Sequence, residues 1–330
     1  MPLRPFRLST DLRICAEILP LAFQYPENPS WNMQDDEAES LVGMLSGLAR
    51  IWPVIGFIQF VVPSLRDYVR GYVWEDEGQP VGVVLLHRQG RTHTWEIVRA
   101  AVMPDHRRQG IGRQLVQASI NYVRKRGGKV ALLDVIAGNT PAYRLYEQTG
   151  FEPFERRTAF DYTRDEPPPE IPLPADCTIA PMALAVWRCK YELASRIVPP
   201  SVQRFQPVRE ARFRPRLSGR LATRIVSLFD MAQERAMVVL APGDGQVVAV
   251  ADYSVHTRQG GVNNISVRVD PNRADVAAYL LHALIRTIQS LSPGRRIELT
   301  IPHWQSKVME AANAAGCVAH VEYHRMGMLV

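Results

Sequence analysis

The sequence predicts an α/β protein in which one unit, a mixed sheet with covering helices, is folded twice. A strand-like apolar run that ends at Val102 leads through a glycine turn into a helix-like run that starts at Gly112. A second strand-like run ends at Val269, and in both halves the valine begins a Val-x-Pro triplet before a helix. Gly150 follows the first valine by 48 residues, and Gly316 follows the second by 47. These three observations predict a tandem repeat.

The length and a proline-rich segment favour the same division. A chain of 330 residues exceeds the usual size of a single domain, and a hydrophobic content of 46% is ordinary for globular protein. Residues 163–175 carry five prolines, which predicts a stiff, extended linker. We therefore expect a first domain at residues 1–162, a linker at 163–175 and a second domain at 176–330.

The turn of the first half has the character of an anion site. Residues 107–112 read Arg-Arg-Gln-Gly-Ile-Gly. A helix N-terminus leaves N–H groups unpaired and carries partial positive charge, glycine permits close approach, and arginine adds charge. A dinucleotide fingerprint is excluded because Leu115 stands where its third glycine belongs, and a P-loop is excluded because no Lys follows the glycines.

The segment after the helix completes a longer pattern. An apolar run at residues 129–136 predicts a buried strand, and residues 139–151 read Asn-Thr-Pro-Ala-Tyr-Arg-Leu-Tyr-Glu-Gln-Thr-Gly-Phe. Pro141 suits the first turn of a helix and Gly150 suits its end. The two motifs, Arg-x-x-Gly-x-Gly and Asn-x-x-Ala-x-x-Leu-Tyr-x-x-x-Gly-Phe, resemble those of the GNAT N-acetyltransferases over about residues 4–162. The resemblance implies two tandem GNAT folds with acetyl-CoA as co-substrate.

The resemblance also implies which residues bind the cofactor. The backbone of Val102 is expected to bind the pantetheine arm, because two strands of the family splay apart there. Asn139 is expected to hydrogen-bond the same arm; the alternative is a helix N-cap, and the two roles are compatible. The implied cofactor-binding residues are Ala101, Val102, Arg107, Arg108, Gln109, Gly110, Ile111, Gly112, Arg113, Asn139, Ala142 and Tyr143.

Acetyl transfer needs a base, because an alkylamine is mostly protonated near neutral pH. The resemblance makes Glu96, six residues before Val102, the general base, and its position in a cleft is expected to move its pKa toward neutrality. The alternatives are a solvated glutamate and one paired with Arg99. Tyr146 is the implied acid that protonates the departing thiolate, and the alternative is a tyrosine packed at the edge of the core.

The expected activity is therefore acetyl transfer to a primary amine by direct attack of the amine on the thioester, without a metal. One alternative is a non-catalytic acyl-CoA sensor or scaffold, against which the presence of Glu96 and Tyr146 argues. A second alternative is an enzyme similar to mycothiol synthase. The motifs do not identify the acceptor amine. We expect a cytoplasmic protein that is a monomer or homodimer.

The second half resembles the first in layout but not in chemistry. Aligned on the two valines, the cradle positions hold Ala274, Ala277 and Tyr279, and a tyrosine obstructs phosphate where glycine is needed. The position of the base holds Asn263, and that of the acid, counted back from the closing glycine, holds Ala312. The second half is therefore expected to be a degenerate GNAT repeat that is structural or helps to form the acceptor site.

Charge adds little about partners. The net charge is +6, and only four of the 39 basic residues are Lys, so the arginine content is interpreted as a compositional bias and no nucleic-acid partner is expected. Seven arginines at residues 204–224 are interpreted as a solvated surface. The alternative for this segment is a grip on an acidic substrate, RNA or a partner protein.

An apolar stretch at residues 41–65 has spanning length, but an arginine near its middle, Pro53 and Pro63 argue against a transmembrane helix. We expect a helix to about Ile51, then a lid over the acceptor site, and no stable membrane insertion. The acidic residues at 35–39 are expected in a solvated loop and the first turn of that helix.

The remaining chemistry-bearing residues suggest no further site. The four cysteines form no Cys-x-x-Cys pair and are expected to be buried reduced thiols, and no His/Cys group has zinc spacing. His93 and His106 lie near the turn and are expected to be non-essential.

Overall fold

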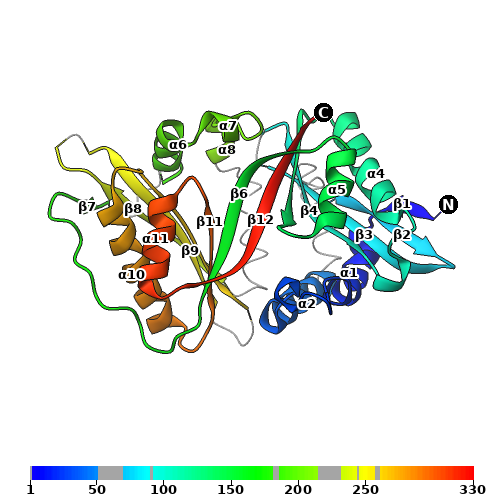
Figure 1. Cartoon of the computed structure of the whole chain (residues 1–330), viewed down its shortest axis with the longest axis horizontal. Coiled ribbons are helices and arrows are strands. Elements are labelled where there is room, and N and C mark those ends of the chain that lie inside the picture. The colour runs from blue at the N-terminus through cyan, green and yellow to red at the C-terminus, as the bar shows by residue number, and fades with distance from the viewer. Residues whose placement is uncertain are drawn as a thin grey trace. The chain divides into compact units, whose positions relative to one another are not determined.

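The structure, a computed structural model, describes residues 2–50, 70–89, 92–180, 186–214, 232–243, 245–256 and 261–330. The described residues group into two compact units (Figure 1). Unit 1 contains the described residues up to Phe154 together with His324–Val330, and unit 2 contains those from Glu155 to Tyr323 that are described.

Unit 1 is a mixed sheet covered by helices. Its strands are β1 (Leu3–Pro5), β2 (Arg70–Asp76), β3 (Gln79–Arg88), β4 (Thr94–Val102), β5 (Val130–Ile136) and the end of β12 (Val318–Leu329), and they lie in that order. Its helices are α1 (Leu8–Ala22), α2 (Asp35–Arg50), α4 (Ile111–Lys125) and α5 (Thr140–Gln148). Strands β3 and β4 are antiparallel, whereas β4 and β5 are parallel. The strand, turn, helix and strand predicted at residues 95–136 are thus confirmed within a residue or two.

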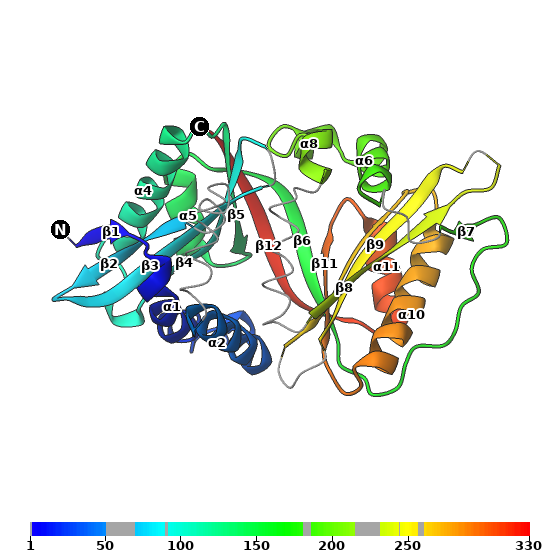
Figure 2. The same ribbon diagram turned by 180° about the vertical axis from the view of Figure 1, so that it is seen from behind.

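Each face of this sheet has its own hydrophobic core. Figures 1 and 2 show α4 and α5 on one side of the strands of unit 1 and α1 and α2 on the other. Trp95, Leu115 and Met326 are buried in the core beneath α4 and α5. Cys15 and Val83 are buried in the core beneath α1 and α2. Because side chains alternate between the faces of a strand, these two cores fix which residues of β4 face each layer.

Unit 2 repeats the order of elements. It contains β6 (Glu152–Tyr162) from Glu155 on, β7 (Thr178–Ile179), α6 (Val186–Ile197), α7 (Pro200–Gln203), α8 (Glu210–Phe213), β8 (Ala232–Leu240), β9 (Val247–His256), β10 (Asn263–Val269), α10 (Ala274–Leu291), β11 (Ile297–Pro302), α11 (Ser306–Ala315) and the start of β12. Strand β10 is antiparallel to β9 and parallel to β11, as β4 is to β3 and β5. The second mixed unit predicted from the sequence is therefore present.

The chain passes between the units inside two strands. Strand β6 begins in unit 1 and continues in unit 2 from Glu155, and β12 begins in unit 2 and continues in unit 1 from His324. The sheet of unit 1 is consequently completed by the last residues of the chain. The domain boundaries predicted after residues 162 and 175 divide the sequence into its two repeats, and this division stays a prediction. Residues 163–175 contain neither helix nor strand, and Arg286 and His282 of α10 bond the carbonyls of Pro168 and Pro169.

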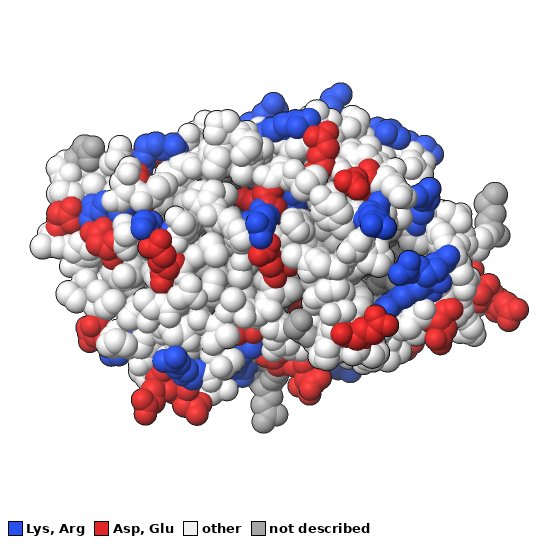
Figure 3. Space-filling model, viewed as in Figure 1, with Lys and Arg blue, Asp and Glu red and all other residues white. Residues whose placement is uncertain are grey.

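Some predicted segments lie partly or wholly outside the described residues. Helix α2 carries Asp35, Asp36 and Glu37 in its first turn, as predicted, and ends at Arg50, but the lid expected from residue 51 onward is outside. Arg216, Arg220 and Arg224 are outside as well. Within the described ranges, no helix combines the length and the apolar character needed to cross a bilayer. On the face drawn in Figure 3, basic and acidic side chains are interspersed.

Candidate active site

Strands β4 and β5 diverge halfway along β4. Their ladder runs from Thr94↔Val130 to Ile97↔Leu133, where the described pairing stops. On the other edge of β4 the register with β3 shifts at the same level, so Val98 is the extra residue of a β-bulge. The carbonyl of Val98 accepts a hydrogen bond from Nη1 of Arg99 at 2.9 Å. The splay implied by the resemblance is thus present, and a local bulge accompanies it.

The divergence leaves the end of β4 open to an added peptide-like group. The N–H of Met103 bonds the carbonyl of Val81 on the β3 side at 2.8 Å. Because backbone groups of successive residues point to alternate edges of a strand, the N–H and C=O of Val102 point to the open side. The N–H of Val102 is suited to an amide of a pantetheine arm, while its carbonyl already accepts Nε of Arg107 at 3.2 Å.

The turn after β4 opens the N-terminus of α4. Arg108 and Gly110 have φ of 66° and 80°, and the left-handed conformation at Gly110 explains why glycine stands there. The first intrahelical bond is made by the N–H of Gln114 to the carbonyl of Gly110 at 3.1 Å, and no side chain caps the helix. The N–H groups of residues 111–113 therefore precede the ladder and can meet an anion.

The side chain of Arg107 contacts protein groups rather than the open turn. Its Nη2 donates to the carbonyl of Ala22, the last residue of α1, at 2.8 Å, and its Nε donates to the carbonyl of Val102 at 3.2 Å. The guanidinium also lies 5.2 Å from the ring centre of Tyr25. Arg107 thus ties the end of α1 to the end of β4, and its expected contact with phosphate stays a prediction.

Tyr146 lies on α5 in a buried setting. Burial, with a smaller contribution from nearby Tyr25, raises the pKa of Tyr146 to about 12, so its phenol is protonated at neutral pH. Its ring meets that of Phe151 edge to face, with centres 6.1 Å apart. Packing at the core, which the sequence left as an alternative, is therefore present. A protonated phenol can donate a hydrogen bond.

Asn139 begins the same helix, and its side chain accepts the N–H of Ala142 at 3.2 Å. The N-cap alternative is confirmed. Burial raises the pKa of Tyr25, while the charge of Arg107 and a hydrogen bond with Asn139 oppose that rise. Tyr25 therefore connects Arg107, Asn139 and Tyr146 at one point, a role that the sequence analysis missed.

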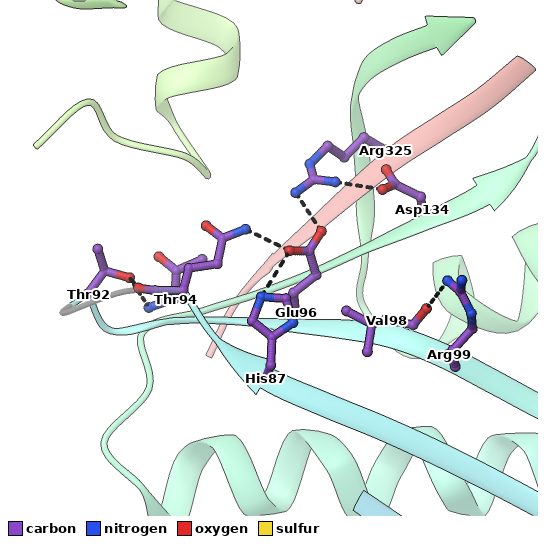
Figure 4. Close-up of polar contacts among 9 residues, drawn as sticks. His87, Thr92, Thr94, Glu96, Val98, Arg99, Asp134 and Arg325 are labelled. Atoms are coloured by element: carbon purple, nitrogen blue, oxygen red, sulfur yellow. Dashed lines mark hydrogen bonds and ion pairs between the residues drawn. The ribbon is translucent and has the colours of Figure 1, made fainter. Parts of the chain in front are cut away.

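Glu96 belongs to a polar group that crosses the sheet of unit 1 (Figure 4). Its Oε1 lies 2.7 Å from Nη2 of Arg325, and its Oε2 accepts Nε2 of Gln89 at 2.8 Å. Nη1 of the same arginine lies 2.6 Å from the carboxylate of Asp134. His87 is opposite Glu96 on β3, with its Nε2 at 3.7 Å from Oε2. One buried guanidinium therefore bridges two carboxylates.

These contacts set the charge of the group. Burial by itself would raise the pKa of Glu96, but the charge of Arg325, the bond from Gln89 and His87 outweigh it and hold that pKa below its usual value. The pKa of Glu96 was expected to move up toward neutral pH, and this expectation is wrong because the pKa moves down. Burial lowers the pKa of His87 more than Glu96 raises it, so His87 is neutral at pH 7. Glu96 and Asp134 thus place two carboxylates beside one guanidinium, an arrangement that suits a cationic amine.

The polar group faces the layer of α1 and α2. Trp95 and Ile97 point into the core of α4 and α5, so Glu96 between them points the other way. The alternative that Glu96 pairs with Arg99 is wrong. The guanidinium of Arg99 donates to the carbonyl of Val98 and lies 3.6 Å from Glu37 of α2. Asp134 could have been predicted as a site residue, because it is the one charged residue in the apolar run at 130–136.

His93 and His106, which the sequence places near the turn, make contacts with groups other than Glu96 and Tyr146. Nδ1 of His93 is 3.0 Å from the carbonyl of Gly127, and Nε2 of His106 is 3.5 Å from Asp76. No three or more His, Cys, Asp or Glu side chains of the described residues are placed to hold a metal ion. All four cysteines are described, each is a free thiol, and Cys189 is the one that is only half-buried.

The counterpart positions in unit 2 serve packing. Asn263 is fully buried, and its Oδ1 accepts the N–H of His256 at 2.8 Å. Ala277 and Ala312 lie in the core, and Tyr279 packs against it. The glycine turn, Glu96 and Tyr146 of unit 1 thus have no chemical equivalent at these positions.

Comparison with known proteins agrees with this geometry. Residues 52–151 match the profile of the Acetyltransferase (GNAT) family. An uncharacterized N-acetyltransferase of Methanocaldococcus jannaschii is 35% identical over 92 residues, which are 26% of this chain and 41% of that protein. The ribosomal protein bS18-alanine N-acetyltransferase of Escherichia coli K12 is 42% identical over 65 residues, 20% of this chain and 44% of that protein.

A mycothiol acetyltransferase of Thermomonospora curvata is 34% identical over 101 residues, 27% of this chain and 33% of that protein. The chain therefore spans less than half the length of each of these curated relatives. Across almost the whole chain the fold is similar to a GCN5-related N-acetyltransferase from Sphaerobacter thermophilus, with a TM-score of 0.63, 17% identity and coverage of 99% and 96%. The fold is also similar to that of a tandem GNAT protein from the clavulanic acid biosynthesis pathway, with a TM-score of 0.62 and 15% identity. That match covers 99% of this chain and 98% of the other.

Proposed function

We propose that this chain, which belongs to the GNAT acetyltransferases through residues 52–151, transfers the acetyl group of acetyl-CoA to a primary amine at a single site in unit 1. The observation that carries the proposal is a juxtaposition within this unit. The open first turn of α4 follows directly on the diverging end of β4, and the anionic Glu96–Arg325–Asp134 group lies across the strands at the start of that divergence.

The cofactor would be held mainly by backbone groups. The N–H groups of residues 111–113 suit the pyrophosphate, because a helix N-terminus favours anions. The N–H of Val102 suits an amide of the pantetheine arm. Arg107 would support both contacts indirectly, since it already joins the end of α1 to the carbonyl of Val102. The other residues that the resemblance implies are part of this proposal.

Glu96 would bind the acceptor as an ammonium ion and later take a proton from the attacking nitrogen. An ammonium ion has no free electron pair, and a carboxylate with a lowered pKa is a weak base toward it, so one proton must first leave to water. The neutral amine then attacks the thioester carbon, its remaining N–H protons become more acidic as the C–N bond forms, and transfer of one of them to Glu96, directly or through water, becomes favourable. Asp134 shares the guanidinium of Arg325 and is the second candidate for this role, because its carboxylate is the more exposed of the two.

Tyr146 would stabilise the departing sulfur. The C–N bond forms, the C–S bond breaks, and the electron pair of that bond stays on sulfur as a thiolate. With a pKa of about 12, the phenol is a weaker acid than a thiol of ordinary pKa ~8.5. Tyr146 therefore acts as a hydrogen-bond donor to the sulfur during cleavage, and the thiolate then takes a proton from water.

The relatives suggest two acceptor classes, an alanine of a ribosomal protein and the acceptor of a mycothiol acetyltransferase, and we propose no choice between them. Purified protein should release free thiol from acetyl-CoA with members of an amine panel that includes both classes. The variants Glu96→Gln and Asp134→Asn should first be shown to bind acetyl-CoA with equal affinity. The base is then the carboxylate whose replacement lowers kcat more. Tight acetyl-CoA binding without turnover on any amine would favour the alternative, an acyl-CoA sensor or scaffold.

A further inference from the structure

The residue that begins α11 in unit 2 is the counterpart of Asn139. Gln305 precedes Gly316 by eleven residues, as Asn139 precedes Gly150, and each is the N-cap of its helix. Asn139 uses its side chain to cap α5. The side chain of Gln305 makes no such cap. The side chain of glutamine is one methylene longer than that of asparagine, and it reaches a different group.

That contact is with the end of β10. Oε1 of Gln305 accepts the N–H of Val269 at 3.0 Å, and Nε2 donates to the carbonyl of the same residue at 3.0 Å. Gln305 is 3% exposed, so both bonds are shielded from water. A primary carboxamide pairs here with both polar groups of one backbone residue, much as a neighbouring strand would.

Val269 corresponds to Val102 of unit 1 in position and in backbone setting. The N–H of Asp270 bonds the carbonyl of Val248 at 2.8 Å, which directs the polar groups of Val269 away from β9. The described ladder of β10 with β11 ends at Ile265↔Leu299, so a gap opens before Val269 is reached. In unit 1 the carbonyl of the equivalent residue, Val102, accepts Nε of Arg107 at 3.2 Å, and the side chain of Asn139 caps α5 instead of reaching this edge.

We propose that the end of β10 is a carboxamide-binding site formed by the N–H and C=O of Val269, and that the chain fills this site with its own Gln305. The ligand class is a primary or secondary amide, the group that recurs in a pantetheine arm. The side chain substitutes for a cofactor amide, satisfies two buried backbone groups and closes unit 2 to acyl-CoA. This inference concerns unit 2 and goes beyond the activity proposed for unit 1.

The site can be tested by removing the side chain and supplying an amide. Gln305→Ala leaves both groups of Val269 buried and unpaired, which should lower Tm by roughly 2–8 °C. Propionamide at tens of millimolar should raise the Tm of this variant by about 2 °C more than that of the wild type, because a ligand stabilises only a state that binds it. N,N-dimethylpropionamide, which has no N–H donor, should have a smaller effect.

Two controls separate this site from a general cavity. Gln305→Met fills the space without hydrogen-bonding groups and should lose stability yet gain nothing from propionamide. Gln289→Ala removes another buried glutamine of unit 2 and should show no selective rescue. An equal propionamide shift in wild type and Gln305→Ala would overturn the proposal. Should the alanine variant not fold, amide exchange decides: the N–H of Val269 should exchange slowly in the wild type and at least tenfold faster in Gln305→Met, and equal rates contradict the site.

Titration with acetyl-CoA distinguishes this inference from the proposed function. One equivalent bound per chain agrees with both. Two equivalents would contradict the closure of unit 2 while leaving the proposed function intact. No binding would refute the proposed function, and the propionamide and exchange measurements would still decide the carboxamide site.

Discussion

Arg325 and Glu96 are 229 residues apart in the chain, yet Nη2 of the arginine lies 2.7 Å from Oε1 of the glutamate. The arginine belongs to β12, the last strand, and the glutamate to β4. Because the same guanidinium lies 2.6 Å from Asp134, the charge of both candidate bases depends on the last residues of the sequence. The candidate site of unit 1 is therefore incomplete without the part of β12 that follows unit 2 along the chain, from His324 on.

Removal of this arginine should shift the pH profile. The pKa of Glu96 is held below its usual value, so the carboxylate is ionised at lower pH than a free glutamate. Arg325→Gln should raise that pKa and move the acidic limb of kcat/KM to higher pH by about 1–3 units. Arg325→Lys retains the charge and should move the limb less, and Arg124→Gln on the exposed face of α4 should leave it in place. A limb that is identical in all four proteins would exclude Glu96 as the group that sets it.

The two glycines of the turn should respond oppositely to alanine. A Cβ at Gly112 would meet only Leu145 at 3.4 Å and Val102 at 3.9 Å, so Gly112→Ala should raise the free energy of unfolding by roughly 0.5–1 kcal/mol. It should also weaken acetyl-CoA binding about tenfold, a loss of ~1.4 kcal/mol, because the added methyl group occupies the approach to the N–H groups. Gly110→Ala should instead destabilise the fold by about 1–2 kcal/mol, because φ is 80° there. Denaturant melts and calorimetric titration measure both quantities; unchanged affinity in Gly112→Ala would contradict the cradle.

Loss of the phenol should slow the chemical step alone. Tyr146→Phe keeps the ring packed against Phe151 and removes the donor to the departing sulfur. We expect kcat to fall by about 100-fold or more with little change in the KM for acetyl-CoA. Tyr72→Phe, at another partly buried tyrosine of unit 1, is the matched control and should retain activity. Equal kcat in the two variants would show that Tyr146 only packs.

The last strand should also be essential to the core of unit 1. Met326 is 0% exposed and packs with the residues beneath α4 and α5, so Met326→Ala should cost about 2–5 kcal/mol of unfolding free energy. Leu329, which is 59% exposed on the same strand, should tolerate alanine within about 0.5 kcal/mol. Equal melting temperatures for the two variants would show that β12 does not stabilise unit 1.

Sequence reasoning succeeded where the physics is local. A Val-x-Pro strand end, a left-handed glycine and an open helix N-terminus lie within about ten residues of one another, so the turn at 107–112 could be predicted from spacing alone. The N-cap at Asn139 and the helix end at Gly150 are equally local. The repeat of the whole unit was detectable because two valines and two glycines keep nearly equal spacing.

The errors concern partners that only folding brings together. The pKa of Glu96 was expected to rise because burial raises it, and the opposing charge of Arg325 could not be inferred across 229 residues. The bond of Arg107 to the carbonyl of Ala22, 85 residues earlier, could not be inferred from the sequence, and the expected contact of Arg107 with phosphate stays a prediction. The bond of Gln305 to Val269, which the sequence did not indicate, likewise depends on where β10 and β11 separate.

The sequence by itself determined the repeated α/β unit, the glycine turn that opens α4 and the loss of that turn from the second copy, because each depends on residue type and short spacing. The tertiary structure alone decided which charges and amides meet: Arg325 at Glu96 and Asp134, and Gln305 at Val269. The physical reason is that electrostatic and hydrogen-bond energies depend on distances of a few ångströms, and those distances are set when strands distant in sequence join one sheet.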